Sequence, residues 1–132
     1  MREILFRGKR KDNGEWICGD LLQDVESGIC AIVSYVNLGG NIHDLSESCI
    51  FAVIPETVGQ YTGLTDKNGV KIFEGDIVRY GDTIHEVVFE QRNGTAYFGL
   101  VYSKSETLPF GHYQDLRQIE VIGNIYDNGY PF

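Results

Sequence analysis

The sequence predicts a mostly β protein with little helix, and three observations favour this fold class. Aromatic residues make up 12% of the 132 residues, and aromatic and β-branched side chains are enriched in strands. The chain holds 16 glycines against three prolines, a balance typical of many tight turns. The pair Asn-Gly, the strongest short-range hairpin signal, occurs four times in the chain.

Three of the Asn-Gly pairs lie between strand-like segments, so we expect three hairpins. Asn13-Gly14 separates ILFRGKRK from EWICGDLL, Asn68-Gly69 separates VGQYTGL from VKIFEGD, and Asn93-Gly94 separates TIHEVVFE from TAYFGLVY. Both residues of the pair tolerate the positive φ that a type I′ turn needs. The fourth pair, Asn128-Gly129, is expected to end the last element of the chain.

Apolar and β-branched runs predict further strands. These are Ile29–Val36, Cys49–Ile54, Asp76–Tyr80 and Ile119–Ile125. The segment Thr95–Tyr102 is nearly apolar throughout, which predicts a strand buried on both faces or one at a barrel seam. Polar stretches at Asn37–Ser48 and Ser103–Gly111 are predicted to be loops. Short helical turns are expected only at His43–Cys49 and Gly111–Gln118, because neither segment sustains a 3.6-residue apolar period.

The formal net charge is −8, and it is spread evenly along the chain. Residues 1–60 hold 5 basic and 9 acidic side chains and residues 61–132 hold 6 and 10, so each part carries −4. Non-specific binding to nucleic acid needs several cations placed on phosphates, and an acidic globule disfavours it. A local basic face is still conceivable. Its candidates are Arg7, Lys9, Arg10, Lys11 and Arg79.

The length predicts one domain spanning residues 1–132, with a soft subdivision near residues 55–58. Cys18, Cys30 and Cys49 are odd in number, far apart and set in apolar runs, so we expect buried, reduced thiols in a cytoplasmic protein. The N-terminus MREILFRG lacks the apolar core of a signal peptide. The longest apolar run is too short to span a bilayer, so no membrane association is expected.

No pattern of catalytic or ligand-binding residues stands out. His43, His85 and His112 are isolated, and Asp66-Lys67-Asn68-Gly69 lacks the glycine and glutamate spacing of an EF-hand. No glycine motif for nucleotides appears, so we expect no metal and no cofactor. Four carboxylates gather in one stretch of sequence: Glu56, Asp66, Glu74 and Asp76. A solvated rim with turn-forming aspartates explains them better than a paired-carboxylate acid–base site.

Four blocks of the sequence resemble the YopX-like family of phage and prophage proteins. These are FRGK at Phe6–Lys9, GEWICGDL at Gly14–Leu21, VGQYTGLTDKNGVKIFEGDIVR at Val58–Arg79 and EVIGNIYDN at Glu120–Asn128. The resemblance covers nearly the whole chain. It implies a small, mostly β fold of antiparallel barrel architecture, with an SH3-like barrel in the C-terminal part, and a phage or prophage origin. It implies no activity and no catalytic residue.

The absence of a catalytic pattern favours a non-catalytic protein-interaction module, which would bind a host or phage protein through an exposed barrel face or sheet edge. Self-association through such an edge is a further expectation. The alternatives are a nucleic-acid-binding accessory protein and a small enzyme acting on a nucleotide or metabolite. The most elaborate backbone is expected around the second hairpin, which makes it the candidate binding region. Its candidate residues are Gln60, Tyr61, Thr62, Glu74 and Asp76.

Overall fold

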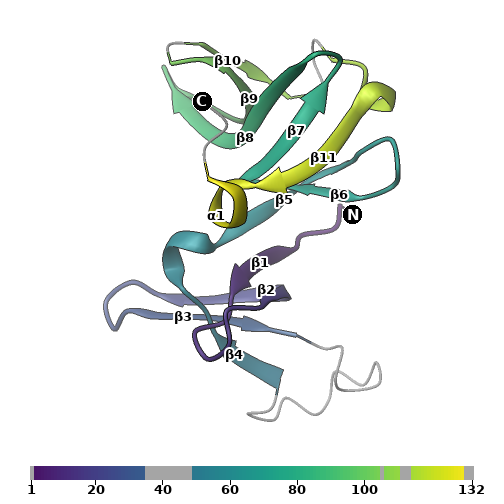
Figure 1. Cartoon of the computed structure of the whole chain (residues 1–132). Coiled ribbons are helices and arrows are strands. Elements are labelled where there is room, and N and C mark those ends of the chain that lie inside the picture. Colours follow the sequence, from purple (N-terminus) through teal and green to yellow (C-terminus); the bar gives the residue numbers. More distant parts are fainter. Residues whose placement is uncertain (1, 35–48, 105, 111–113, 130–132) are drawn as a thin grey trace. The chain divides into compact units, whose positions relative to one another are not determined.

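The structure, a computed structural model, describes residues 2–34, 49–104, 106–110 and 114–129. The chain divides into two compact units, Met1–Gln60 and Tyr61–Phe132 (Figure 1). Most of the described residues lie in antiparallel strands, which confirms the mostly β prediction. That the two units act as the single domain predicted from length stays a prediction.

The first unit is an antiparallel sheet in which β4, β3, β2 and β1 pair in that order and the start of β5 pairs with β1. Its elements are β1 (Phe6–Lys9), β2 (Trp16–Asp24), β3 (Ile29–Val33), β4 (Ile50–Ala52), the 3-10 helix η3 (Pro55–Thr57) and the beginning of β5 (Gly59–Thr65). A bridge between Arg10 and Val53 also ties the end of β4 to the end of β1. Gly8 lets the strands approach closely, because a Cβ there would lie 3.1 Å from the Cβ of Val53. The buried apolar residues of this unit are Ala31, Ile32, Val33, Cys49 and Val53.

The second unit holds the rest of β5, which forms a hairpin with β6 (Lys71–Phe73), and a five-stranded antiparallel sheet of order β10-β9-β8-β7-β11. The sheet consists of β7 (Asp76–Tyr80), β8 (Thr83–Arg92), β9 (Thr95–Ser103), β10 (Glu106–Pro109) and β11 (Ile119–Asn124). The 3-10 helix η4 (Leu116–Gln118) precedes β11, and the short helix α1 (Ile125–Asn128) follows it. The core of this unit consists of Ile72, Val78, Val87, Leu100 and Ile119.

The strands of the second unit do not close into the predicted barrel, and the SH3-like description is not confirmed. β10 and β11 are the two edges of the five-stranded sheet. At the β11 edge, the backbone N–H of Lys67 donates to the carbonyl of Ile119, and the carboxylate of Asp66 accepts from the N–H of Val121, at 2.9 Å each. A turn and a carboxylate therefore occupy edge groups that a closing strand would pair.

All three predicted hairpins are present, but only one has the predicted turn. Asn93 and Gly94 both have positive φ, 51° and 78°, and form a two-residue turn. In the other two turns the glycine alone has positive φ. There the side chains of Asn13 and Asp66 accept hydrogen bonds from the backbone N–H two residues on, which favours a longer turn. The fourth pair ends α1, as predicted, because the N–H of Gly129 caps that helix.

Three predictions for individual segments need correction or limitation. The predicted loop Ser103–Gly111 contains β10, which pairs with β9. The segment Thr95–Tyr102 is not buried on both faces, since Ala96 is exposed and only two of its residues are buried. The described part of Gly111–Gln118 forms η4, as predicted, whereas the predicted loop Asn37–Ser48 lies outside the described residues. The helix α1 comes from a segment with no helical signal.

The three cysteines are free thiols in different environments. Cys49 is buried, Cys30 is intermediate and Cys18 is exposed. The prediction of buried thiols holds for Cys49 and is wrong for Cys18, because Cys18 points to the opposite face of β2 from the buried Gly19.

Candidate functional site

Three of the predicted binding residues follow one another on β5. Gln60 is half-buried and is the last residue of the first unit. Tyr61 is 8% exposed, and its ring packs against Phe73 of β6 with the ring centroids 5.6 Å apart. Thr62 donates its hydroxyl to the carbonyl oxygen of Ile72 at 2.8 Å. The contacts of Tyr61 and Thr62 hold the β5–β6 hairpin together, and a binding role for the three residues stays a prediction.

The other two predicted residues flank the turn between β6 and β7. Gly75 has a φ of 93°, so the chain reverses there in a conformation that favours glycine. Asp76 is 1% exposed, and its carboxylate accepts a hydrogen bond of 2.7 Å from the N–H of Phe73. The N–H of Gly75 donates to the carbonyl of Val87 at 2.8 Å. Asp76 therefore stabilises the turn from inside, while Glu74 stays half-buried beside it.

Glu74 influences a second carboxylate, that of Glu86 on β8. Burial raises the pKa of Glu86, and the negative charge of Glu74 raises it further. Among the described residues, no group of three or more His, Cys, Asp or Glu side chains is placed to hold a metal ion. Because the pKa of Glu86 is raised, ionisation of this carboxyl destabilises the folded protein.

Asp66 organises the turn of the β5–β6 hairpin and its attachment to β11. One carboxylate oxygen accepts from the N–H groups of Asn68 and Val70, at 2.8 and 2.9 Å, and the other accepts from the N–H of Val121 at 2.9 Å. Burial raises the pKa of Asp66, but these hydrogen bonds and the charge of Lys67 outweigh burial and hold the pKa below its usual range. The carboxylate is thus engaged by its own backbone and acts as a structural group.

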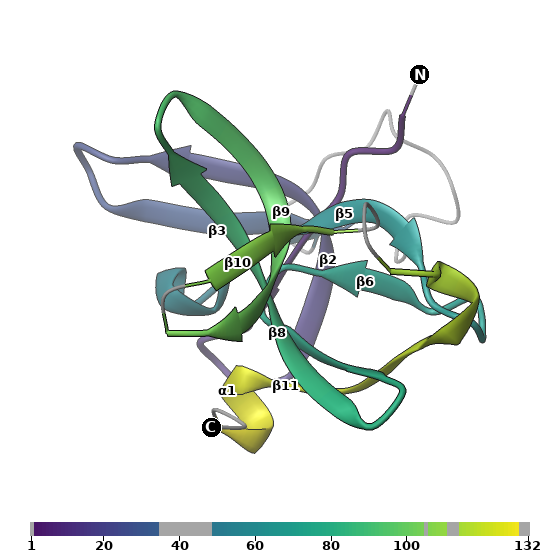
Figure 2. The ribbon, with the colours of Figure 1, turned by 90° about the horizontal axis from the view of Figure 1, so that it is seen from above.

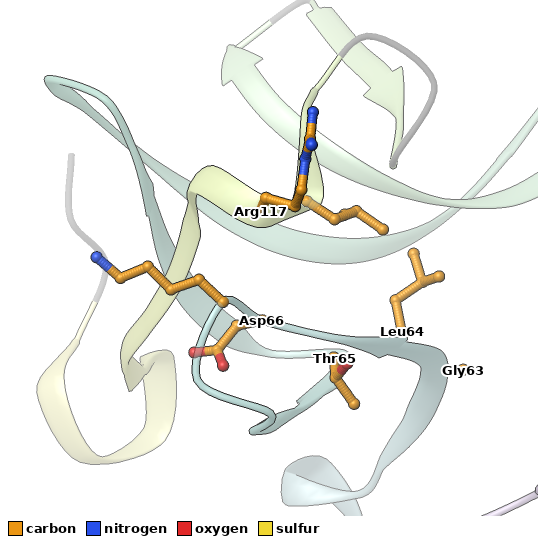
Figure 3. A pocket seen from close by; sticks show the side chains of 7 residues that line it. Gly63, Leu64, Thr65, Asp66 and Arg117 are labelled. Atoms are coloured by element: carbon orange, nitrogen blue, oxygen red, sulfur yellow. The ribbon is translucent and has the colours of Figure 1, made fainter.

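Two open hollows adjoin this turn, and Figure 3 shows the first of them. The first, of about 400 Å³, is lined by Gly63, Leu64, Thr65, Asp66, Lys67, Leu116 and Arg117. The second, of about 370 Å³, is lined by Lys67, Arg79, Gly81, Arg117, Gln118 and Glu120. Lys67 and Arg117 belong to both. In Figure 3 the side chain of Arg117 is directed away from the carboxylate of Asp66.

The cations of these hollows are each held by a carboxylate. Glu120 lies 3.4 Å from the Nζ of Lys67 and 3.7 Å from the guanidinium of Arg79. Asp115 accepts two hydrogen bonds of 3.0 Å from the guanidinium of Arg117. The carboxylates of Glu120 and Asp115 thus pair with all three cations. The hollows therefore present little surplus positive charge and are weak candidates for an anion site.

A two-stranded ribbon with an exposed aromatic face forms the far end of the β8–β9 hairpin, from Val88 to Phe98. In Figure 2 the tip of this hairpin extends past β10. Phe89 lies opposite Phe98, edge to face, with ring centroids 5.1 Å apart. The two rings share a strand face with Val87 and Leu100, which are fully buried in the core. This apolar face is therefore covered at Val87 and Leu100 but extends past the core to the aromatic pair, where Phe89 is 41% exposed.

Both edges of the β8–β9 ribbon are open within the part of the chain that the structure describes. On the β8 side, the last backbone hydrogen bond from a neighbouring segment reaches the carbonyl of Val87, from Gly75. On the β9 side, the last one reaches the carbonyl of Phe98, from Phe110. Beyond these points the ribbon offers backbone donors and acceptors with which another strand can pair.

The predicted basic cluster divides between two aromatic partners in the first unit. The guanidinium of Arg7 and the ammonium of Lys9 lie over the indole ring of Trp16, 4.8 and 5.5 Å from its centroid. The guanidinium of Arg10 lies instead over the ring of Phe51, 4.4 Å from its centroid. Side chains next to each other on a strand point to opposite faces, which explains the separation of Lys9 from Arg10.

The remaining cations of the predicted basic face are dispersed. Arg10 also donates two hydrogen bonds, of 2.9 and 2.6 Å, to the carboxylate of Asp12. Lys11 is exposed in the turn after β1. Arg79 lies on β7, in the second unit. A single face built from all five cations stays a prediction.

His85 is the one histidine within the described ranges. Its ring is 3% exposed, with Nδ1 2.9 Å from the carbonyl oxygen of Val101 and Nε2 2.8 Å from the hydroxyl of Thr83. A ring bound on both nitrogens by its own sheet has a structural role. His43 and His112 lie outside the described residues. No helix in the described ranges has the length and apolar character needed to cross a membrane.

Comparison with known proteins identifies the family. The crystal structure of protein EF1440 from Enterococcus faecalis aligns with 97% of this chain over 96% of its own length, with a TM-score of 0.55 and 23% sequence identity. At this identity the likeness concerns the fold alone. A search of curated proteins gives no significant match. The model of the YopX protein family matches residues 5–130, nearly the whole chain, and the chain therefore belongs to the YopX family.

Proposed function

We propose that this protein is a non-catalytic interaction module that binds a partner protein through the β8–β9 ribbon. The observation that carries the proposal is the aromatic face of the exposed Phe89 and the half-buried Phe98, which lies beyond the core of the second unit. Aromatic side chains are enriched at protein interfaces, because they bury a large area with few rotatable bonds. An edge-to-face pair in which Phe89 is exposed and Phe98 is half-buried is well suited to serve as such an anchor.

The partner that fits the ribbon is an extended protein segment with apolar and basic side chains. The open ribbon edges can supply main-chain hydrogen bonds to an added strand, and the Phe89 face can receive its apolar side chains. Leaving His85 aside, the charged side chains of β8 and β9 are Glu86, Glu90 and Arg92. Their net charge is −1. The whole chain carries −8, so a basic segment is attracted both locally and over longer range.

Family membership and the resemblance to phage and prophage proteins support three further parts of the proposal. The chain is of phage or prophage origin, it acts in the cytoplasm of a bacterial host, and the partner is a host or phage protein. A small enzyme acting on a nucleotide or metabolite has less support. Glu74 and Asp76, which that alternative needs in a pocket, line neither of the two hollows at the Asp66 turn.

The test compares the wild type with two variants in capture from a nuclease-treated bacterial lysate. Phe89→Glu places a charge on the aromatic face. Val70→Glu, the matched control, places the same charge on an apolar residue of similar exposure, 47%, in the β5–β6 turn of the same unit. Each captured protein is then purified, and calorimetry measures its affinity for the wild type and for both variants. The same measurement is made with a peptide from the captured protein that contains basic and apolar side chains.

The expected result is one partner whose affinity falls at least about tenfold with Phe89→Glu and is unchanged with Val70→Glu. Equal binding to both variants, or no binding partner for the wild type, would count against the proposal. A second copy of the chain as the occupant would appear in ultracentrifugation as a concentration-dependent dimer that Phe89→Glu abolishes.

A further inference from the structure

We propose that the partner segment adds as a strand to the β8 edge of the ribbon, and that its sequence alternates apolar and basic residues. This pattern rests on the proposed function, because the segment binds the same ribbon. The backbone of β8 determines which edge an added strand can pair with. The side chains of β8 then determine which residue types that strand carries on each of its faces.

The hydrogen bonds of the sheet show which backbone groups of β8 point away from β9. The carbonyl of Val87 accepts from the N–H of Gly75, so the backbone groups of Val87 point outward. In an antiparallel pair alternate residues direct their N–H and C=O to the same side, so those of Phe89 and Gln91 also point outward. The pairing of β7 with β8 ends at Glu86. Within the described ranges, the N–H and C=O groups of Phe89 and Gln91 therefore form an open edge.

The β9 edge offers less to an added strand. Phe98 lies opposite Phe89, and its carbonyl already accepts from the N–H of Phe110. Beyond Phe98, the next residue of β9 whose backbone groups point outward is Ala96. The side chains from Thr95 to Gly99 carry no charge, so nothing on this part of β9 selects a basic strand.

The two faces of β8 differ in chemical character along the open edge. One face carries Phe89, which is 41% exposed. The other face, called the carboxylate face below, carries Glu86, Val88 and Glu90 in succession. Glu74 adds negative charge near it, because the charge of Glu74 raises the pKa of Glu86. A strand on this edge thus meets an aromatic ring on one face and carboxylates on the other.

An added strand directs its own side chains to the same two faces in turn. Its residues beside Phe89 and Gln91 point to the aromatic face, where an apolar side chain covers the exposed ring of Phe89. Its residues beside Val88 and Glu90 point to the carboxylate face. A lysine or arginine there reaches Glu86 and Glu90, because diagonal neighbours on adjacent strands lie only about 7–8 Å apart. Apolar and basic residues therefore alternate along the strand.

Arg92 leaves the carboxylate of Glu90 able to bind a further cation. Its guanidinium lies 3.6 Å from that carboxylate, but the side chain of Arg92 is 52% exposed. An ion pair exposed to this degree contributes little to stability. A cation of the added strand can therefore join Arg92 at Glu90 or replace it.

Two labelled peptides of the same composition serve as probes, and fluorescence anisotropy measures their affinity at physiological ionic strength. In the first peptide valine and lysine alternate. In the second the same residues follow one another in pairs, so that each face of a strand carries both kinds. The alternating peptide should bind at least about tenfold more tightly, because it alone presents all its apolar side chains to the aromatic face.

Two proline variants show which edge the peptide pairs with. Gln91→Pro removes an outward N–H from the β8 edge. Ala96→Pro is the matched control, because Ala96 lies opposite Gln91 and its N–H points outward from β9. Gln91→Pro should weaken binding of the alternating peptide at least about tenfold, and Ala96→Pro should leave it unchanged. Circular dichroism confirms that each variant is folded.

Two charge variants test the carboxylate face. Glu90→Gln removes a carboxylate beside the added strand, and Glu106→Gln, the matched control, removes one from β10 of the same sheet. Glu90→Gln should weaken binding of the alternating peptide about fivefold. Glu106→Gln should leave the affinity nearly unchanged, because salt screens charges that lie far from the peptide.

Four results would overturn the proposal. They are no binding of the alternating peptide, equal binding of the two peptides, equal losses with Gln91→Pro and Ala96→Pro, and equal losses with Glu90→Gln and Glu106→Gln. The charge variants keep the proposal testable if Gln91→Pro unfolds. The lysate capture decides the proposed function separately. A captured partner that Phe89→Glu releases supports that function even if the two peptides bind alike, whereas the expected peptide results without any captured partner count against that function alone.

Discussion

Replacement of Asp66 by alanine is expected to destabilise the second unit by about 3 kcal/mol. Asp66 is 6% exposed. Its carboxylate accepts three hydrogen bonds of 2.8 to 2.9 Å from the backbone N–H groups of Asn68, Val70 and Val121. A hydrogen bond to a charged group contributes about 1.5–3 kcal/mol, and the three are not additive because they share one acceptor. With a typical urea dependence of about 1–3 kcal/mol per molar, the unfolding midpoint should fall by roughly 1–3 M.

The pH dependence gives a second measure of the same carboxylate. The folded pKa of Asp66 lies below its usual range, so its charge stabilises the fold above the unfolded pKa, about 3.9, and this stabilisation is lost as the pH falls through the folded pKa. Asp66→Asn should therefore lie well below the wild type at pH 7 and approach it below about pH 4. Asp12→Asn, which changes an exposed carboxylate, is the control and should leave the midpoint nearly unchanged. Midpoints that fall equally for Asp66→Asn and Asp12→Asn would refute the reasoning.

Two further predictions concern the β6–β7 turn and the carboxylate beside it. Urea unfolding should show that Gly75→Ala lowers the free energy of unfolding by about 2–3 kcal/mol and Gly81→Ala by about 1 kcal/mol. Both glycines have positive φ, but a Cβ at Gly75 would also lie 2.9 Å from the ring of Tyr126. Equal losses of stability for the two variants would contradict this contact. Glu86→Gln should raise the unfolding midpoint at pH 7 and leave it unchanged below about pH 4. The sign follows because burial and the charge of Glu74 raise the pKa of Glu86, so ionisation destabilises the fold as the pH rises; a lower midpoint at pH 7 would show the reverse.

Hairpins were the most predictable part of this fold, because their signals are local. Each Asn-Gly pair between strand-like segments marks a hairpin, and the pair Asn93-Gly94 also forms the predicted two-residue turn. The other turns differ because Asn13 and Asp66 bond the backbone with their side chains. The pattern of apolar residues does not reveal these hydrogen bonds, although Asn and Asp side chains often bond the backbone of a turn.

Elements that depend on distant pairing were less predictable. β10 lies in a stretch that reads as a loop, and it is a strand because β9 offers it an edge. The barrel expectation failed for a related reason, since the carboxylate of Asp66 reaches Val121, 55 residues further along the chain. Strand periodicity indicates that such segments exist, but it does not indicate which edge each one meets.

The candidate binding residues show the same division between local and distant information. The sequence places Gln60, Tyr61 and Thr62 in an elaborate hairpin, and the structure shows Tyr61 and Thr62 engaged in holding that hairpin together. The exposed face of Phe89 could not be identified in this way. An alternating strand predicts that Phe89 shares a face with Val87, but not that the core ends between them.

Charge composition is a poor guide to the binding surfaces of this chain, because an even average conceals local arrangement. The run Arg7 to Lys11 reads as one basic cluster in the sequence, yet strand alternation sends Lys9 and Arg10 to different aromatic partners. On the side of β1 that faces Trp16, the cations of Arg7 and Lys9 both lie over the indole ring. A run of cations in the sequence therefore does not show which side of a strand each cation takes.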